Sequence, residues 1–287
     1  MTLKVLQKGF NYSQDGPGNR LVYHLQGCQL HCPWCSNPES IPAGGVLLQK
    51  GRPEDTACPF GAVKDGALDR AVCARCESKP CAAVPGSGLV WSCAEEDIEA
   101  LLDEAGRSRK LFFDGGGVTL TGGDPFAQFE ATAFFLARLK EEGIHTAVET
   151  NGCHPRIPEL FGLIDFLMID CKHYDSAKHA EATGAGNETV LANIYRALEE
   201  RSQLLIRIPL IEGFNAGKPD AEGFAALFEG RNTGNCQFEL LRYHEYGKDK
   251  WVQCGLEYTI KSAEVSDSRY RQFRDTLAEK HFHIVST

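Results

Sequence analysis

The chain has 287 residues, which suits one barrel-sized domain with an insert or two small domains. It is acidic, with 39 Asp and Glu against 30 Lys and Arg, and it has no basic arm or stripe, so we expect no nucleic-acid partner. No apolar run approaches the ~18 residues of a membrane span, and the N-terminus MTLKVLQKGF lacks the apolar core of a signal peptide. These features predict a cytoplasmic protein.

The first unusual segment is GCQLHCPWCSN at residues 27–37, which places Cys28, Cys32 and Cys35 in one loop. Twelve cysteines in a cytoplasmic chain indicate metal or redox chemistry rather than a disulfide framework. A 4Fe–4S cluster is normally held by four thiolates, so a Cys-x3-Cys-x2-Cys loop leaves one iron open to a small ligand. The alternatives are a zinc site completed by a distant residue and unliganded core cysteines. Zinc loops favour Cys-x2-Cys pairs.

The next segment, residues 46–92, is rich in Cys, Pro, Gly and charge and has no helical period. We interpret it as a small metal-stapled insert between the first and second β-α units. The predicted domains are therefore a barrel made of residues 1–45 and 93–287 and a cluster-binding insert at 46–92.

The insert contains ACPFGAV, which resembles the end of a bacterial ferredoxin motif, where a cysteine precedes proline. Four cysteines with such spacing predict one auxiliary 4Fe–4S cluster: Cys58, Cys73, Cys76 and Cys81. A zinc ribbon is the alternative. Cys93 precedes a predicted acidic helix at 94–106 and is interpreted as a helix-start residue, although spacing alone does not decide between it and Cys81.

From residue 110 onward, the pattern alternates between strands and helices. Strands are predicted at 117–124, 144–152, 166–175, 204–213, 238–247 and 282–286, and helices at 125–143, 188–202 and 266–281. Repeated β-α units predict a parallel sheet with right-handed crossovers. An open doubly wound sheet and a full or partial β/α barrel both fit this order.

Glycine-rich or polar motifs lie where successive predicted strands end and loops begin. They are TGGDP (121–125), ETNG (149–152), DCK (170–172), RIP (207–209) and RYHEYG (242–247). Each alone is typical of an ordinary turn or a solvated strand end. In β/α barrels, however, reactive groups sit where strands end, so five such motifs predict one pocket that faces the loop of Cys28 to Cys35.

The motifs together resemble those of one family. CQLHCPWC resembles the radical SAM signature, and YSQDGPGNR (12–20) resembles the N-terminal block of the glycyl radical enzyme activating enzymes of the pyruvate formate-lyase activase group. CSNPES, DGGGVTLTGGDP, ETNG, IDCKHYD, RIPLIEGFN and YHEYGKDKW resemble later blocks of that family. The resemblance spans nearly the whole chain outside the insert. It implies a radical SAM partial (β/α)6 barrel with a small ferredoxin-like iron–sulfur insert.

The resemblance also implies a site. Cys28, Cys32 and Cys35 would hold a 4Fe–4S cluster, whose open iron is chelated by S-adenosylmethionine (SAM). Trp34 would pack near the adenine, and the TGGDP turn would contact the methionine amino group. The implied cofactor-binding residues are Trp34, Asn37, Gly122, Gly123, Asp124, Asn151, Lys172, Arg207 and His244. Asp124 stands where the family usually has Glu, and His244 has the alternative of a neutral side chain packed in the barrel mouth.

The family's cation site maps onto Glu149 and Asp170, with Glu149 in place of the usual Asp, and implies a monovalent cation there. Longer members carry two clusters in the insert. Here the cysteines expected upstream of Cys58 are missing, so one auxiliary cluster is expected.

The implied reaction begins with one electron from a small reductant such as flavodoxin or ferredoxin. SAM is cleaved to methionine and a 5′-deoxyadenosyl radical, which takes hydrogen from a backbone glycine of a partner glycyl radical enzyme. The cofactor carries this chemistry, so no side chain is predicted to be catalytic. The alternatives are a radical SAM enzyme that acts on a small molecule and an iron–sulfur electron carrier. The DGPG block argues against the first, and a three-ligand cluster argues against the second.

Overall fold

A computed structural model describes residues 1–10, 14–200 and 203–286, so the first two residues of the 12–20 block lie outside the described residues. Within them, nine strands form one sheet in the order β13-β12-β11-β10-β9-β8-β2-β1-β7. The strands are β1 (Thr2–Gly9), β2 (Arg20–Leu25), β7 (Ala94–Asp97), β8 (Gly117–Gly122), β9 (Thr146–Thr150), β10 (Phe166–Asp170), β11 (Leu204–Leu210), β12 (Cys236–Arg242) and β13 (Ile284–Val285).

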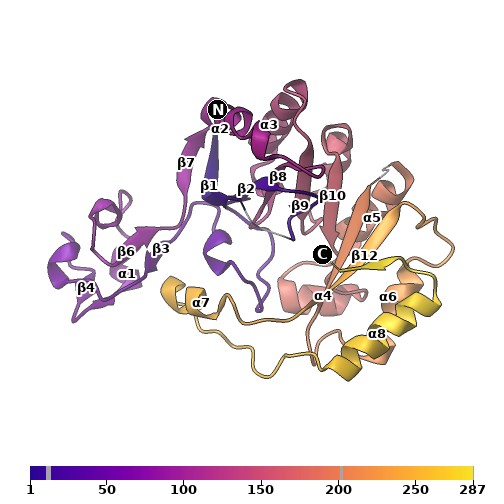
Figure 1. Ribbon diagram of the computed structural model, residues 1–287. Coiled ribbons are helices and arrows are strands. Elements are labelled where there is room, and N and C mark those ends of the chain that lie inside the picture. The colour runs from indigo at the N-terminus through magenta and orange to yellow at the C-terminus, as the bar shows by residue number, and fades with distance from the viewer. Residues whose placement is uncertain (11–13, 201–202, 287) are drawn as a thin grey trace.

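Strands β2 and β8 to β12 run parallel to one another, and β13 adds a further parallel strand beside β12. Strand β1 pairs antiparallel with both β2 and β7. The predicted α/β class with a central parallel sheet is therefore confirmed. Because β13 and β7 lie at opposite edges, the described strands form an open, partial barrel (Figure 1).

The longer helices follow the strands along the chain: α2 (Ile98–Arg107), α3 (Phe129–Glu141), α5 (Glu188–Glu200), α6 (Lys218–Leu227) and α8 (Asp267–Glu279). The helices predicted at 125–143, 188–202 and 266–281 are confirmed as α3, α5 and α8, although residues 201–202 lie outside the described residues. The first residues of the 125–143 prediction form a 3-10 turn instead, η5 (Pro125–Gln128). Two shorter helices also lie in the described part of the barrel: α4 (Ser176–Thr183) and α7 (Lys248–Cys254).

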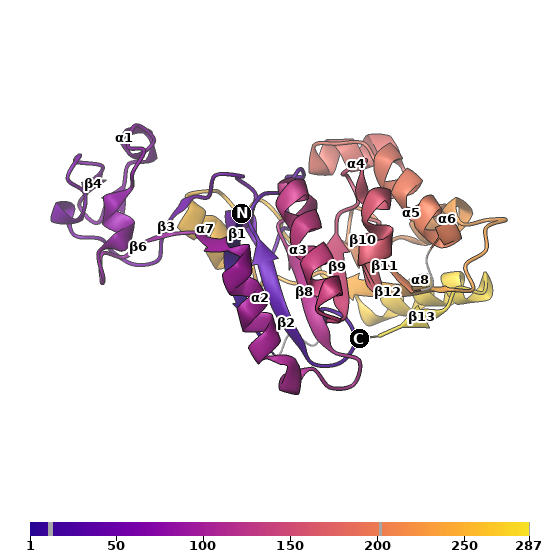
Figure 2. The ribbon, with the colours of Figure 1, turned by 90° about the horizontal axis from the view of Figure 1, so that it is seen from above.

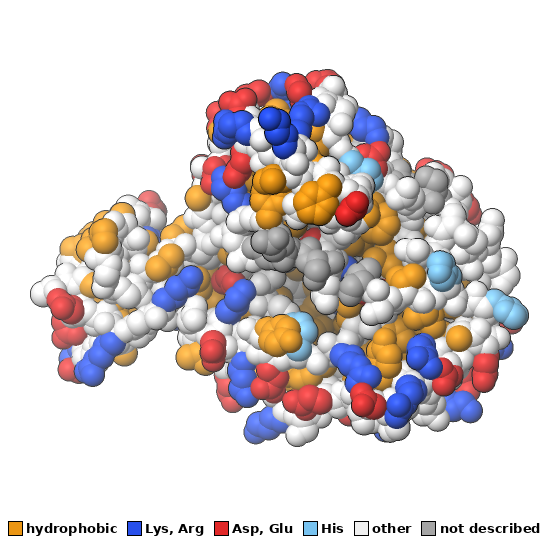
Figure 3. Space-filling model, viewed as in Figure 1, with side chains coloured by type: hydrophobic (Ala, Val, Ile, Leu, Met, Phe, Trp, Pro, Cys, Tyr) orange, Lys and Arg blue, Asp and Glu red, His pale blue; other side chains and the backbone are white. Residues whose placement is uncertain are grey.

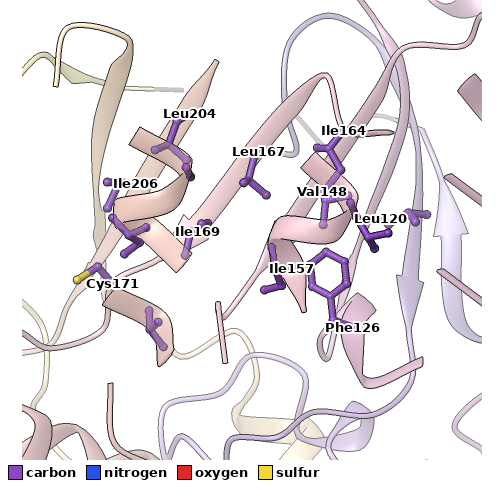
Figure 4. Close-up of a cluster of buried hydrophobic side chains, with 14 of the residues drawn as sticks. Leu120, Phe126, Val148, Ile157, Ile164, Leu167, Ile169, Cys171, Leu204 and Ile206 are labelled. Carbon is purple, nitrogen blue, oxygen red and sulfur yellow. The ribbon is translucent and has the colours of Figure 1, made fainter. Parts of the chain in front are cut away.

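The main core lies between the sheet and these helices. Leu120, Val148, Leu167 and Ile206 come from four neighbouring strands and are at most 1% exposed, and Figure 4 shows them beside residues of the loops that follow. Parallel strands of this kind are buried on both faces, which is why they appear as near-continuous apolar runs in the sequence.

The acidic helix predicted at 94–106 is wrong in its first turn. Residues 94–97 are strand β7, because they pair with the start of β1, with Thr2 opposite Asp97. The helix begins only at Ile98, after the Asp97 side chain accepts the Glu99 N–H at 3.1 Å as an N-cap.

Residues 47–91 contain short pieces of structure that pack on one another. Strand β3 (Leu47–Gln49) pairs with β6 (Leu89–Trp91), and β4 (Val63–Lys64) pairs with β5 (Ala67–Leu68). One-turn elements lie between them: η2 (Asp55–Ala57), α1 (Arg70–Cys73) and η3 (Pro80–Ala83). They share a small apolar cluster that is separate from the main core, and Figures 1 and 2 show them projecting to one side of the barrel. They interrupt the crossover from β2 to β8 ahead of α2, rather than following a complete first β-α unit.

No described helix is long and apolar enough to cross a membrane. On the face shown in Figure 3, acidic and basic side chains are interspersed, without a basic stripe.

Candidate functional site

A cavity of about 500 Å³ opens at the carboxyl ends of the parallel strands. It is lined by residues from the cysteine loop and from the turns after five successive strands, as in other β/α barrels. Most of the predicted site residues lie on its wall: Cys28, Cys32, Trp34, Cys35, Asn37, Gly122, Gly123, Glu149, Asn151, Asp170, Lys172, Arg207 and His244. The structure therefore brings together predicted site residues that are up to 216 positions apart in the chain, from residue 28 to residue 244.

The three thiols of the loop lie in low-dielectric surroundings. Burial raises the pKa of Cys28 to about 11 and that of Cys35 to about 12, where the neighbouring Cys32 adds to the effect. A metal centre must therefore displace protons to bind there, which is the usual coupling of metal binding to thiol ionisation.

Backbone and side-chain N–H groups point at two of the sulfurs. Leu30 N and Asn151 Nδ2 lie 3.4 and 3.5 Å from Cys28 Sγ, and Asn37 N lies 3.4 Å from Cys35 Sγ. Donors of this kind orient thiolate ligands and set the reduction potential of iron–sulfur clusters. Among the described residues, no group of three His, Cys, Asp or Glu side chains is arranged around a single metal ion. A cubane makes a different demand, because each thiolate binds its own iron.

The glycine pair of the TGGDP turn lets the turn approach the cysteine loop. Gly122 has φ +119°, and a Cβ on Gly123 would lie 2.3 Å from the Gly27 carbonyl oxygen. The Asp124 N–H donates to that same carbonyl at 2.7 Å. Glycine is thus required here for the contact between two loops as well as for room in the cavity.

Of the residues predicted to bind SAM, Asp124 is the one that does not line the cavity. Its carboxylate is fully buried and accepts hydrogen bonds from Phe126 N (2.9 Å), Thr150 Oγ1 (2.7 Å) and Asn151 N (2.8 Å). The Asp124 side chain is one methylene shorter than Glu, and its carboxylate caps the 3-10 turn that follows it in the chain. The Asp124 carboxylate therefore braces its own turn and the start of the Asn151 loop, and its direct contact with SAM stays a prediction.

Two cations on the cavity wall, Arg207 and Lys172, form three ion pairs. Arg207 pairs with Glu149 at 2.5 Å and with Glu239 at 2.9 Å. Lys172 pairs with Asp170 at 2.5 Å. Burial disfavours the charge on both cations, but the neighbouring carboxylates outweigh it and raise the pKa of Arg207 and of Lys172 above the ordinary values. Both side chains therefore stay charged at neutral pH.

Sequence reasoning missed several residues of the wall, among them the titratable Asp15 and His24. Burial, together with the nearby Glu149 carboxylate, raises the pKa of Asp15 to about 7. Burial lowers the pKa of His24 to about 4, which keeps its ring neutral. The DGPG block was the available signal for Asp15, whereas His24 lies within a strand buried on both faces, where no pattern marks it.

A hydrogen bond from β8 holds the Asp15 segment in place. Thr119 Oγ1 donates to the Asp15 carbonyl at 2.6 Å, and the buried Arg20 guanidinium donates to Thr119 Oγ1 at 2.6 Å and to the Val118 carbonyl at 2.7 Å. This network fastens the DGPG block to β8.

Two rings flank the cavity mouth. Trp34 lies 4.8 Å from the Phe214 ring, centroid to centroid, and His244 stacks on Tyr246 at 4.2 Å. Burial lowers the pKa of His244. The lowered pKa agrees with the alternative in which His244 is a neutral side chain packed in the barrel mouth. His244 also lines the cavity, so its position is equally suitable for contact with a ligand.

The four predicted ligands of the insert lie close together. Cys73 and Cys81 are buried in the small apolar cluster, and Cys58 packs against it. Burial raises the pKa of Cys81, and Cys58, Cys73 and Cys76 add to that rise. The charged neighbours that affect Cys93 are Lys4 and Glu95, with no cysteine of the described chain among them. This grouping supports Cys81 over Cys93 as the fourth member.

The sequence is similar to those of known proteins over most of its length. The radical SAM superfamily matches residues 22–221. A 4-hydroxyphenylacetate decarboxylase activating enzyme of Clostridioides difficile is 31% identical over 92% of this chain and 90% of its own. An isethionate sulfite-lyase activating enzyme of Nitratidesulfovibrio vulgaris is 35% identical over 92% of each chain.

Among solved structures, Streptococcus suis SuiB bound to S-adenosylmethionine has a TM-score of 0.56 at 12% identity, over 93% of this chain and 49% of its own, which shows a shared fold. The chain belongs to the radical SAM superfamily and, within it, to the glycyl radical enzyme activating enzymes.

Proposed function

We propose that this chain activates a partner glycyl radical enzyme by generating a radical on a backbone glycine of that partner. The observation that carries the proposal is one cavity that joins three thiols, with no fourth among the described residues of its wall, to paired cations and amides. When bound, a 4Fe–4S cluster at Cys28, Cys32 and Cys35 supplies the electron that cleaves SAM to methionine and the 5′-deoxyadenosyl radical that takes the glycine hydrogen.

The side chains of the cavity bind and orient SAM. Lys172 lies near the cysteine loop, since Cys32 and Cys28 contribute to its raised pKa, and its ammonium suits the SAM carboxylate. Asn151 bridges Cys28 and Gln29 Oε1, at 3.1 Å from the latter, and sets one edge of the site. Trp34, beside Phe214, offers an apolar face to the adenine. The other residues of the proposed SAM site are Asn37, Gly122, Gly123, Arg207 and His244.

The direct test is formation of the glycine radical. Anaerobically iron-loaded protein, a reductant, SAM and the glycyl radical enzyme encoded nearby should give a doublet in electron paramagnetic resonance. Omitting SAM or this chain should remove it. SAM cleavage without a radical on any glycyl radical enzyme encoded nearby would contradict the proposal and favour a small-molecule substrate.

We further propose that a monovalent cation binds beside Glu149 and Asp170. Both carboxylates line the cavity, and a bound SAM carboxylate adds a third anion to a site that holds Arg207 and Lys172. Like charges in one pocket repel unless a cation lies between them. SAM should therefore bind several-fold more tightly in sodium or potassium than in tetramethylammonium, as measured by equilibrium binding at constant ionic strength.

The Asp170→Asn variant is the control for this prediction, because it should bind SAM with equal affinity in all three salts. Equal affinity of the parent protein in all three salts would show that Arg207 and Lys172 alone neutralise the site.

For the insert, we propose that residues 46–92 form a unit that holds one auxiliary 4Fe–4S cluster at Cys58, Cys73, Cys76 and Cys81. The closeness of the four thiols supports this assignment. Flavodoxin or ferredoxin is the proposed electron donor, and the insert, which projects from the barrel (Figure 2), is a suitable place for it to bind.

A further inference from the structure

Helix α7 lies between the insert and the barrel, as both ribbon views show (Figures 1 and 2). On one side it packs against η1 (Pro38–Ser40), the turn that directly follows the cysteine loop. On the other it packs against β3 of the insert. The helix is therefore placed to connect the two groups of cysteines.

Two side chains of α7 hold the last part of the cysteine loop. Trp251 Nε1 donates to the Cys35 carbonyl at 3.0 Å. Lys250 Nζ donates to Asn37 Oδ1 at 2.6 Å and pairs with the buried Glu39 at 2.9 Å. The start of the helix also abuts the loop, because a Cβ on Gly247 would lie 2.6 Å from the Cys35 carbonyl oxygen.

One of the residues that α7 holds, Asn37, points its backbone N–H at the sulfur of Cys35, a predicted cluster ligand. The Asn37 N–H lies 3.4 Å from Cys35 Sγ, and α7 fixes the Cys35 carbonyl before it and the Asn37 side chain beside it. A hydrogen bond to a cluster sulfur stabilises the more negative, reduced state and so raises the reduction potential. The position of α7 should therefore affect the reduction potential of the cluster proposed at Cys28, Cys32 and Cys35.

The insert holds the other end of α7 through Arg70. Its Nη2 donates to the Gln253 carbonyl at 2.7 Å, and its Nη1 donates to the Leu47 carbonyl of β3 at 2.9 Å. The packing is close, because a Cβ on Gly255, directly after the helix, would lie 1.9 Å from Arg70 Nε. Arg70 is the first residue of α1, the single turn that ends at Cys73.

We propose that α7 couples the insert to the first cluster site. Arg70 fixes α7 against the insert, and Trp251 and Lys250 then act as positioning residues for the segment from Cys35 to Asn37. The order of the insert, which the metal at Cys73 would increase, thereby sets the geometry and the reduction potential at the barrel site. The role of the potential rests on the proposed function, whereas the contacts of Arg70, Trp251 and Lys250 join atoms of the chain itself.

The first test measures the reduction potential of the barrel cluster in full-length, iron-loaded protein. Arg70→Met removes both carbonyl contacts, and Trp251→Phe keeps an aromatic ring but removes the N–H donor. Both variants should shift the potential to more negative values. The matched controls are Arg52→Met, whose guanidinium bonds within the insert to Asp65, and Val252→Ala, whose side chain on α7 is exposed. Both controls should keep the parent potential.

The second test uses iron-free protein and hydrogen exchange. Amides of the segment that α7 holds, among them Cys35 N and Ser40 N, are bonded to Cys32 and Asn37 carbonyls. They should exchange roughly fivefold faster in Arg70→Met and in Trp251→Phe, as expected for the loss of one hydrogen bond. Exchange in the two controls should match the parent.

Unchanged exchange in both variants would overturn the coupling, as would an unchanged potential in both at full iron content. If Arg70→Met does not retain the iron of the insert, the coupling is tested instead by hydrogen exchange in the iron-free protein and by the reduction potential of Trp251→Phe. The exchange result does not depend on SAM chemistry, so failure of the proposed function and failure of this coupling are distinguishable.

Discussion

The Cys32→Ala variant is expected to lose SAM cleavage in the reduced, iron-loaded protein. Cys32 is the most buried thiol of the loop, at 8% exposure, and its loss leaves two thiolates to hold a cubane. Partners outside the ligand shell are typically worth 10–100-fold in metal affinity or activity, so removal of a ligand should cost more than ~100-fold. The measurement is 5′-deoxyadenosine formed per minute under dithionite without oxygen.

Cys153→Ala is the matched control. Its thiol is near enough for the charges of Cys28 and Cys32 to affect its pKa, which burial raises to about 12, yet it lies outside the cavity wall. We expect this variant to keep the parent rate. Parent-level turnover by Cys32→Ala would contradict the three-thiolate site, and a loss of turnover in Cys153→Ala would reveal a fourth ligand.

The parts of the site that lie at strand ends could be predicted from sequence. The motifs at 149–152, 170–172 and 207–209 follow apolar runs, and parallel strands bring their carboxyl ends to one edge. A local pattern therefore implied a shared pocket without knowledge of any contact. The same logic does not show which way a short side chain turns, and Asp124 turned back to cap its own 3-10 turn.

Contacts between distant segments could not be predicted in this way. Trp251 and Cys35 are 216 positions apart, and no period or composition links an indole N–H to that carbonyl. Strand β7 was missed for a similar reason, since its acidic sequence favours a helix and only pairing with β1 makes it a strand. The pKa of Asp15 depends on burial and on Glu149, and both arise only after folding.

The double variant Cys73→Ala/Cys76→Ala is expected to halve the iron content, from about eight to about four irons per chain, because each cubane holds four irons and the insert cubane would lose two of its four thiolates. The insert has only a small apolar cluster of its own, to which Cys73 and Cys81 belong. A unit of this size gains much of its order from bound metal. The lost irons should therefore be those of the insert, and they should be counted by metal analysis after anaerobic reconstitution.

The barrel cluster should survive this change, with its SAM-dependent electron paramagnetic resonance signal still present. Lys79 helps to close the insert loop, since its Nζ donates to the Cys73 carbonyl at 2.7 Å and to the Cys76 carbonyl. These backbone contacts remain when the thiols are removed. Cys171→Ala/Cys236→Ala, which removes two buried thiols of the barrel, is the matched control and should keep all the iron. Zinc in the insert, or about four irons in the unmodified protein, would contradict the auxiliary cluster and leave the three-thiolate site as the only iron–sulfur centre assigned in the described chain.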